Sequence, residues 1–212
     1  MNIWHEIKKS FHEGNNLIKL IYVNITVFLL VQIVRVFLFL MNVGDEGFSL
    51  VHWLAVPASF GDLILKPWTV FTYMFLHEEF LHILFNMLWL FWFGRIFLVF
   101  LNQKQLLTVY LLGGLTGAAF FVLAFNIFPV FNETINLSVA LGASASVMAV
   151  VFGTVTVSPN YTIQIPFLGP VKIKWIALIF IVMDIMQIPI GNAGGHIAHL
   201  GGAFPFLFCE TK

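Results

Sequence analysis

The chain has 212 residues, of which 60% are hydrophobic and 9% are charged, and its formal net charge is zero. Soluble domains carry about 25% charged residues, so this composition excludes an ordinary soluble domain and is typical of a polytopic membrane protein. The balanced charge gives no indication of nucleic-acid binding. Cys209 is the only cysteine, which excludes an intrachain disulfide and a thiolate metal cluster.

The polar segment 1–16 precedes the first long apolar run and resembles the start of a signal peptide. However, the run reaches Met41 with no A-x-A-like cleavage site after it, and it exceeds the 7–15 residues of a signal-peptide core. We therefore expect a retained membrane anchor. The predicted organisation is a short cytoplasmic N-terminal segment, residues 1–16, followed by one membrane domain, residues 17–212.

Six apolar stretches predict six transmembrane helices, since a hydrocarbon core of about 30 Å needs about 20 helical residues. They are residues 17–41, 81–101, 105–128, 137–157, 174–190 and 194–208. The last stretch is short and contains Pro205, so we expect a short, truncated final helix. The predicted fold class is an all-α six-helix membrane bundle.

The distribution of lysines predicts the orientation of these helices. With the N-terminus inside, a single lysine, Lys66, falls in an outer connection. The others fall on the inner side: Lys8, Lys9, Lys19, Lys104, Lys172, Lys174 and Lys212. By the positive-inside rule, both termini are expected to be cytoplasmic, in a cell membrane. Arg35 lies inside the first span, and the sequence offers no partner for it.

The connection 42–74 is long and semi-apolar, and it contains Trp53, Trp68, Pro57 and Pro67. It is too interrupted by proline and glycine to form a seventh span. We expect an interfacial loop or an amphipathic hairpin, with tryptophan at headgroup depth. In the third span, the pair Gly113-x-x-x-Gly117 predicts a helix contact.

A polar stretch at the start of the second span begins with His77-Glu78, as a zinc-protease H-E-x-x-H motif does. That motif needs histidines four apart, whereas His77 and His82 are five apart, about 140° around a helix. The zinc-protease motif is therefore excluded. His82 and Asn86 are four apart and share a face, where they suit donation to an anionic oxygen. The alternative is a structural polar pair that bridges helices.

Two further polar stretches interrupt the fourth and sixth spans. Ser144 and Ser146 lie in a run of small residues, where serine often only bonds its own helix or permits close packing. His196 and His199 are three apart and share a helix face. They are either packing histidines or a metal pair, which would need a further ligand such as His82.

The predicted depth connects the three stretches. With the N-terminus inside, spans two, four and six all run from outside to inside. His82, Ser144 and His199 lie near the starts of these spans, within roughly 10–15 Å of the outer surface at 1.5 Å per residue. Together the three stretches supply a nucleophile, a base and oxyanion donors.

These residues resemble the motifs of the rhomboid intramembrane serine proteases. The resemblance rests on His82-x-x-x-Asn86-Met87, Gly142-x-Ser144 and Ala198-His199-x-Gly201-Gly202, and it covers about residues 17–204 in the family's order. It implies a peptidase that cuts single-span membrane proteins in the bilayer, near the outer end of their helix. It implies no metal and no cofactor.

By this resemblance, Ser144 is the nucleophile and His199 its general base, a dyad without a carboxylate. His82, Asn86 and the backbone N–H of Ser144 are expected to hold the oxyanion, and Gly142 to admit the substrate backbone. The supporting residues are His77, His196 and Met148. Ser146, about 200° around the helix from Ser144, is expected to face away.

The chain departs from the family pattern in the loop and in the helices. In the loop, the family's Trp-Arg pair appears as Trp68-Thr69. Ala145 replaces a glycine, and Met148 stands where an aromatic residue often stacks on the catalytic histidine. Phe206 replaces a helix glycine and follows Pro205. Pro205 is expected to kink the last helix, and the bulk of Phe206 to oppose the packing that holds His199 near Ser144.

Two alternatives remain open from the sequence. One is a rhomboid-like protein that binds membrane helices without cutting them. The other is a small transporter with a His-lined metal or proton site, which Asp184 within the fifth span favours because intramembrane carboxylates mark ion paths. The simpler interpretation of Asp184 is a helix-contact carboxylate.

Overall fold

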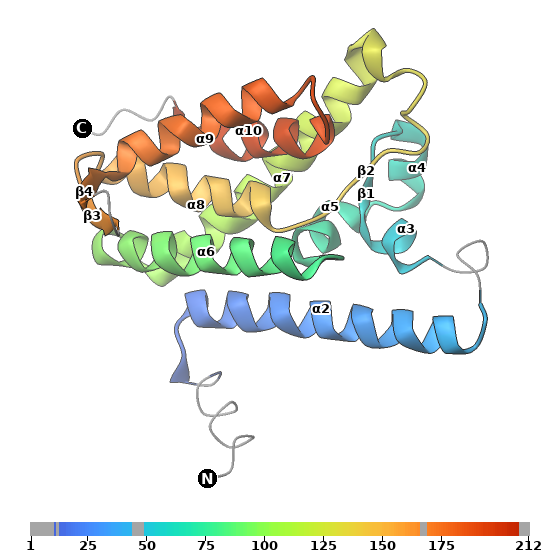
Figure 1. Ribbon diagram of the computed structural model, residues 1–212, viewed down its shortest axis with the longest axis horizontal. Coiled ribbons are helices and arrows are strands. Elements are labelled where there is room, and N and C mark those ends of the chain that lie inside the picture. Colours follow the sequence, from blue (N-terminus) through green and yellow to red (C-terminus); the bar gives the residue numbers. More distant parts are fainter. Residues whose placement is uncertain (1–10, 12, 44–48, 166–168, 208–212) are drawn as a thin grey trace.

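The computed structural model describes residues 11, 13–43, 49–165 and 169–207 (Figure 1). Its main helices are α2 (Asn16–Leu40), α6 (Phe80–Phe100), α7 (Gln103–Ile127), α8 (Ser144–Val157), α9 (Ile173–Gln187) and α10 (Ala193–Leu207). Helices α6, α8 and α10 run in the same direction, and α2 lies along one edge of the bundle beside α6.

Within the described residues, three helices are long and apolar enough to cross a membrane: α2, α6 and α7. Helices α8, α9 and α10 have 14, 15 and 15 residues, or about 21–23 Å at 1.5 Å per residue. The predicted fourth helix, 137–157, begins too early. Residues Val139–Ala140 form strand β2 instead, and Gly142 has a φ of +118°, which a right-handed helix cannot contain.

Glycines and alanines bring α7 and α8 into close contact. A Cβ atom at Gly113 would lie 2.1 Å from Cβ of Ala149, and one at Gly117 would lie 2.5 Å from Cβ of Ala145. The Gly113-x-x-x-Gly117 pair is therefore a helix-contact motif, as predicted. Ala145, in place of the family's glycine, is accommodated because its methyl group lies over Gly117.

The connection between α2 and α6 is not a hairpin. Its described part forms α3 (Leu50–Leu54), strand β1 (Val56–Pro57), α4 (Phe60–Leu65), α5 (Thr69–Thr72) and the 3₁₀ turn η1 (Tyr73–Phe75). The Trp68 indole donates a hydrogen bond to the carbonyl of Trp53 (2.9 Å), and the two rings stack. The interfacial location of this loop remains a prediction.

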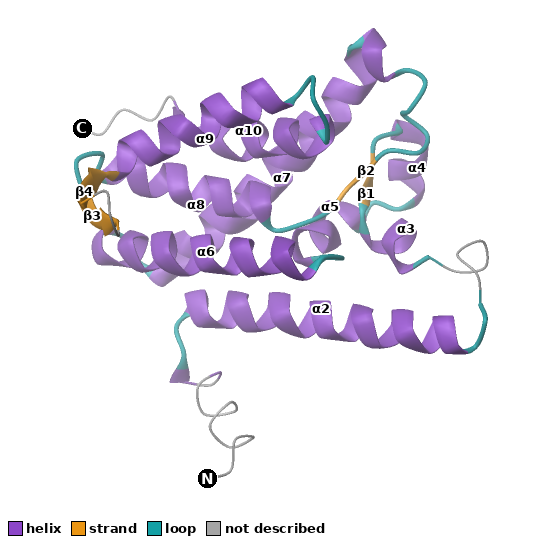
Figure 2. Ribbon diagram, viewed as in Figure 1, coloured by secondary structure: helices purple, strands orange, loops and turns teal. Residues whose placement is uncertain are grey.

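Two small antiparallel sheets occur within the described residues (Figure 2). In the first, β1 pairs with β2, so that Val56 lies opposite Ala140 and Pro57 opposite Val139. This pairing attaches the α2–α6 loop to the segment that leads into α8. The second sheet pairs β3 (Thr162–Ile165) with β4 (Gly169–Lys172) between α8 and α9; the six-helix prediction did not include it. A further 3₁₀ turn, η2 (Pro129–Phe131), follows α7.

The expected steric conflict at the end of α10 does not occur. The helix continues past Pro205 to Leu207, and the Phe206 ring lies 3.6 Å from where a Cβ atom of Gly153 would be. The Thr156 hydroxyl donates to the carbonyl of Phe206 (3.0 Å). The expectation about Phe206 was wrong because α8 presents a glycine where this ring needs space.

Arg35 has a partner that the sequence did not reveal. Its guanidinium lies 3.6 Å from the carboxylate of Glu78, and the side-chain amide of Gln32 donates to the carbonyl of Glu78 (2.9 Å). These contacts attach α2 to the segment before α6. Because both charged side chains are partly exposed, the ion pair contributes little to stability.

Candidate active site

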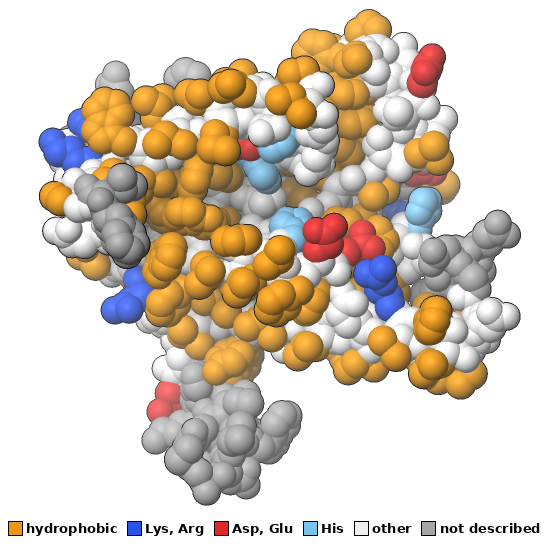
Figure 3. Space-filling model, viewed as in Figure 1, with side chains coloured by type: hydrophobic (Ala, Val, Ile, Leu, Met, Phe, Trp, Pro, Cys, Tyr) orange, Lys and Arg blue, Asp and Glu red, His pale blue; other side chains and the backbone are white. Residues whose placement is uncertain are grey.

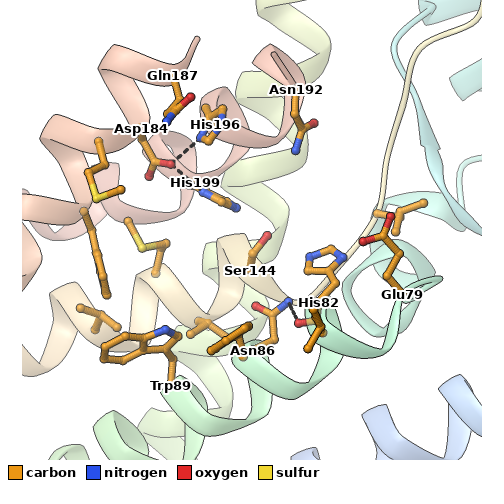
Figure 4. Close-up of a pocket in the computed structure, with 18 residues that line it drawn as sticks. Glu79, His82, Asn86, Trp89, Ser144, Asp184, Gln187, Asn192, His196 and His199 are labelled. Atoms are coloured by element: carbon orange, nitrogen blue, oxygen red, sulfur yellow. Dashed lines mark hydrogen bonds and ion pairs between the residues drawn. The ribbon is translucent and has the colours of Figure 1, made fainter. Parts of the chain in front are cut away.

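A cavity of about 560 Å³ opens between α6, α8, α9 and α10. The visible face of the molecule is mostly hydrophobic, and acidic and histidine side chains gather where it is hollowed (Figure 3). Six of the predicted site residues line the cavity (Figure 4): His82, Asn86, Ser144, Met148, His196 and His199. Stretches more than 100 residues apart in sequence are thus brought to one place.

Ser144 is the first residue of α8 and faces the cavity. The N–H groups of the first helical turn have no carbonyl partner within their own helix, so the Ser144 N–H is available to a bound group. Ser146 is fully buried and is not part of the cavity lining. The two serines therefore face different surroundings, and Ser144 is the one that can meet a substrate.

Gly142 makes room for the His82 ring. A Cβ atom at Gly142 would lie 2.7 Å from Cε1 of His82 and 3.7 Å from Oγ of Ser144. With a φ of +118°, the position requires glycine for its backbone as well as for space. We expected Gly142 to admit the substrate backbone; in this structure the space beside it holds an imidazole.

The side-chain amide of Asn86 is engaged by the protein itself. Its Nδ2 atom donates to the carbonyl of His82 (3.0 Å) and lies 3.3 Å from Nε2 of His77. Donation to an oxyanion therefore requires one of these bonds to be exchanged. The bond to His77 is the longer and weaker of the two, so it is the one to exchange.

His77 holds neighbouring parts of the site in place through buried hydrogen bonds. Its side chain is completely buried, and this burial, with a smaller contribution from His82, lowers the pKa of His77 to about 4. The neutral ring donates from Nδ1 to the carbonyl of Phe75 (3.4 Å), and its Nε2 accepts from the N–H of Ala143 (3.3 Å). This second bond fixes the backbone immediately before Ser144.

A carboxylate lies beside the predicted base. Oδ1 of Asp184 is 2.9 Å from Nδ1 of His199 and 2.7 Å from Nδ1 of His196. In Figure 4 the His199 ring lies between Asp184 and Ser144. The expectation of a histidine without a carboxylate partner was wrong, because the turn after α9 brings Asp184 against α10.

Asp184, rather than His82, is also the third group of the possible metal cluster. The ligand atoms of Asp184, His196 and His199 all lie within 4.8 Å of one another. The sequence signal for Asp184 was its position in an apolar span, but its partners depend on how α9 and α10 pack.

Comparison with known proteins shows the family of the chain. A family model described as the Rhomboid domain matches residues 65–207. The chain is also 30% identical over 144 residues to RHOMBOID-like protein 12, mitochondrial, of Arabidopsis thaliana. That alignment covers 64% of this chain and 43% of the relative, so the chain spans less than half of the relative's length. Since the family model matches 143 of the 212 residues and includes α6 to α10, the chain belongs to the rhomboid family.

Proposed function

We propose that the protein is an intramembrane serine endopeptidase in which Ser144 is the nucleophile and His199 the general base. The observation that carries this proposal is the shared cavity, which Ser144 enters from the first turn of α8 and His199 from α10. A substrate peptide bond in this cavity would meet both side chains. Family membership supports a rhomboid-like function.

In the proposed reaction, Nε2 of His199 accepts the Ser144 hydroxyl proton while Oγ bonds to the substrate carbonyl carbon. His199 then gives that proton to the leaving amine as the peptide C–N bond breaks, which leaves an acyl-enzyme. Water loses a proton to the same nitrogen and attacks the ester carbon. Release of the acid returns the proton to Ser144 and restores the starting state.

The developing oxyanion would be held by the Ser144 N–H, His82 and Asn86. The Ser144 N–H makes no hydrogen bond within the helix. The His82 ring lies beside Gly142, and so does the Ser144 hydroxyl. A single well-placed donor of this kind accelerates acyl transfer about 10²–10³-fold. The Asn86 amide would contribute after it exchanges its bond to His77.

The proposed substrates are single-span membrane proteins, cut near the outer end of their helix. A peptide bond paired within a helix cannot be attacked, so the substrate must unwind locally, and small residues favour this.

We further propose that six helices cross a cell membrane with both termini in the cytoplasm. The long helices α2, α6 and α7 support membrane embedding; the orientation rests on the lysine distribution alone. We propose that no cofactor is needed.

A specific observation favours a second candidate, a metal-binding site of a transporter. The cluster of Asp184, His196 and His199 has the number and type of ligands that zinc accepts. However, this cluster lies in the same cavity as Ser144. A metal bound there would occupy the proposed base, so the two functions exclude each other and one experiment separates them.

The test is cleavage of a single-span reporter in liposomes, with covalent labelling of the protein by a fluorophosphonate. We expect the wild type to cut and to be labelled at Ser144. Ser144→Ala should lose both properties, and His199→Ala should lose cleavage. The matched control is Ser146→Ala, which removes a hydroxyl two residues away that does not line the cavity and should retain activity.

Reporter binding without cleavage or labelling by the wild type would contradict the proposal and support a helix-binding protein. Metal-dependent flux that is lost in His196→Ala, without labelling of Ser144 in the wild type, would support the transporter.

A further inference from the structure

We infer that Asp184 is a positioning residue for the reaction, so that this site works as a Ser144–His199–Asp184 triad rather than as a dyad. The inference rests on the proposed function, and it adds a residue from α9 to a mechanism otherwise built on α6, α8 and α10. The carrying observation is the hydrogen bond of 2.9 Å between Nδ1 of His199 and Oδ1 of Asp184.

This bond determines which nitrogen of His199 is free. A carboxylate only accepts hydrogen bonds, so Nδ1 of His199 must carry the proton. The neutral ring then has its lone pair on Nε2, the nitrogen that has to accept the Ser144 proton. The opposite tautomer would present an N–H to Ser144 and could not act as a base. Asp184 therefore selects the reactive form and stabilises the imidazolium that forms during attack.

His196 holds the carboxylate in place. Its Nδ1 lies 2.7 Å from the same oxygen, Oδ1, so that two N–H donors from one face of α10 converge on one acceptor. The Asp184 side chain is 9% exposed, and in such surroundings a hydrogen bond is stronger than in water, while an unpaired carboxylate would be costly. The second donor limits rotation of the carboxylate away from His199.

The distances favour hydrogen bonds over a bound metal. Zinc holds nitrogen and oxygen ligands at about 2.0–2.1 Å with tetrahedral angles, which separates two ligand atoms by about 3.3 Å. The two N···O separations here are 2.7 and 2.9 Å, which are typical of charge-assisted N–H···O bonds, so zinc binding would require these atoms to move apart. Both contacts also use one oxygen, as a shared acceptor does.

The first experiment compares reporter cleavage by the wild type, Asp184→Asn and Asp184→Ala in liposomes. Asparagine can offer an N–H to Nδ1 and so favours the unreactive tautomer; we expect kcat to fall by about 100-fold or more with little change in KM. Formate should partly restore cleavage by Asp184→Ala, because a small carboxylate can enter the cavity. The matched control is Glu133→Gln, an exposed carboxyl outside the cavity, which should behave as the wild type.

A second measurement needs no variant of Asp184. In ¹⁵N-histidine NMR of the folded wild type, with His196→Gln and His199→Gln used only for assignment, both rings should show the Nδ1–H tautomer at neutral pH. The Nε2–H tautomer at His199 would overturn the inference even if every Asp184 variant misfolds. Stoichiometric zinc in the purified wild type, with loss of the N–H signals, would overturn it in favour of a metal site.

These results are distinguishable from failure of the proposed function. If the wild type neither cuts the reporter nor is labelled at Ser144, the peptidase proposal fails and the triad with it. If the wild type cuts and is labelled, but Asp184→Asn keeps the wild-type kcat, only the triad is overturned. A fall in kcat without formate rescue, together with the Nε2–H tautomer, would also overturn it and leave Asp184 a structural role.

Discussion

Replacing Gly202 by alanine should separate α10 from α8 at the point where they carry the proposed base and nucleophile. A Cβ atom at Gly202 would lie 2.1 Å from the backbone oxygen of Ala145 and 3.0 Å from its Cα. An ordinary contact is at least 3.4 Å, so the helices must move apart by about 1.3 Å. The obstacle is backbone next to Ser144, so a side-chain rotation cannot relieve it.

The expected consequences follow from that displacement. Misplacing a catalytic group by about 1 Å costs about 100-fold in rate, and overpacking of this kind destabilises a protein by about 1–3 kcal/mol. Gly202→Ala should therefore cut the reporter about 100-fold more slowly than the wild type and show a lower Tm. Slower labelling of Ser144 by the fluorophosphonate should accompany both effects.

The matched control is Gly191→Ala, in the turn between α9 and α10. A Cβ atom at Gly191 meets nothing within 4 Å, and the backbone there does not require glycine. This variant should keep the activity and Tm of the wild type. Gly202→Ala with wild-type cleavage and labelling would refute the argument that close packing of α8 and α10 aligns the site.

Three further predictions concern the surroundings of the site. Gly142→Ala should lose at least about tenfold in cleavage rate, because the new methyl group would lie 2.7 Å from the His82 ring at a strained φ; wild-type rates would contradict this. The pKa of His77 is about 4 in the folded protein against an ordinary 6.5, so below pH 6.5 the unfolded chain binds more protons. The free energy of unfolding should then fall as the pH drops from 6.5 towards 4, by up to about 3 kcal/mol. In the variant His77→Gln, Tm should depend less on pH in this window. If Tm depends on pH as strongly in the variant as in the wild type, His77 is not the cause. Phe206→Gly should lower Tm without raising activity, because the Phe206 ring packs against Gly153. Faster cleavage by this variant would instead indicate that the bulk of Phe206 opposes the packing of α10 on α8.

The sequence predicted the three long helices of the described residues well. The ranges 17–41, 81–101 and 105–128 differ from α2, α6 and α7 by no more than two residues at each end. The start of the fourth helix was predicted seven residues too early, at 137 rather than Ser144. Hydropathy does not distinguish an apolar strand from the first turns of a helix, and the β1–β2 pairing is made by partners distant in sequence.

The sequence predicted those site residues that belong to motifs. It did not predict the contacts that depend on how the helices pack. Histidine spacing and the Gly142-x-Ser144 pattern identified His82, Ser144 and His199, which line one cavity. The partners of Asp184 were not identified, because the bond depends on the rotation of α9 relative to α10. When a helix is apolar on most sides, its sequence gives little indication of which side faces a neighbouring helix. The rhomboid resemblance implied a dyad, in which this carboxylate has no role.

The attachment of the α2–α6 loop to the strand before Ser144 has a consequence for the assembly of the site. The bond from the Ala143 N–H to His77 joins residues 66 apart in sequence, and the β1–β2 pair joins residues still further apart. Closing such loops costs conformational entropy before the contact forms, so contacts of this kind form late in folding. In helices that have already inserted, the candidate site would therefore remain incomplete until the loop closes, so it would be the last part of the newly made protein to form.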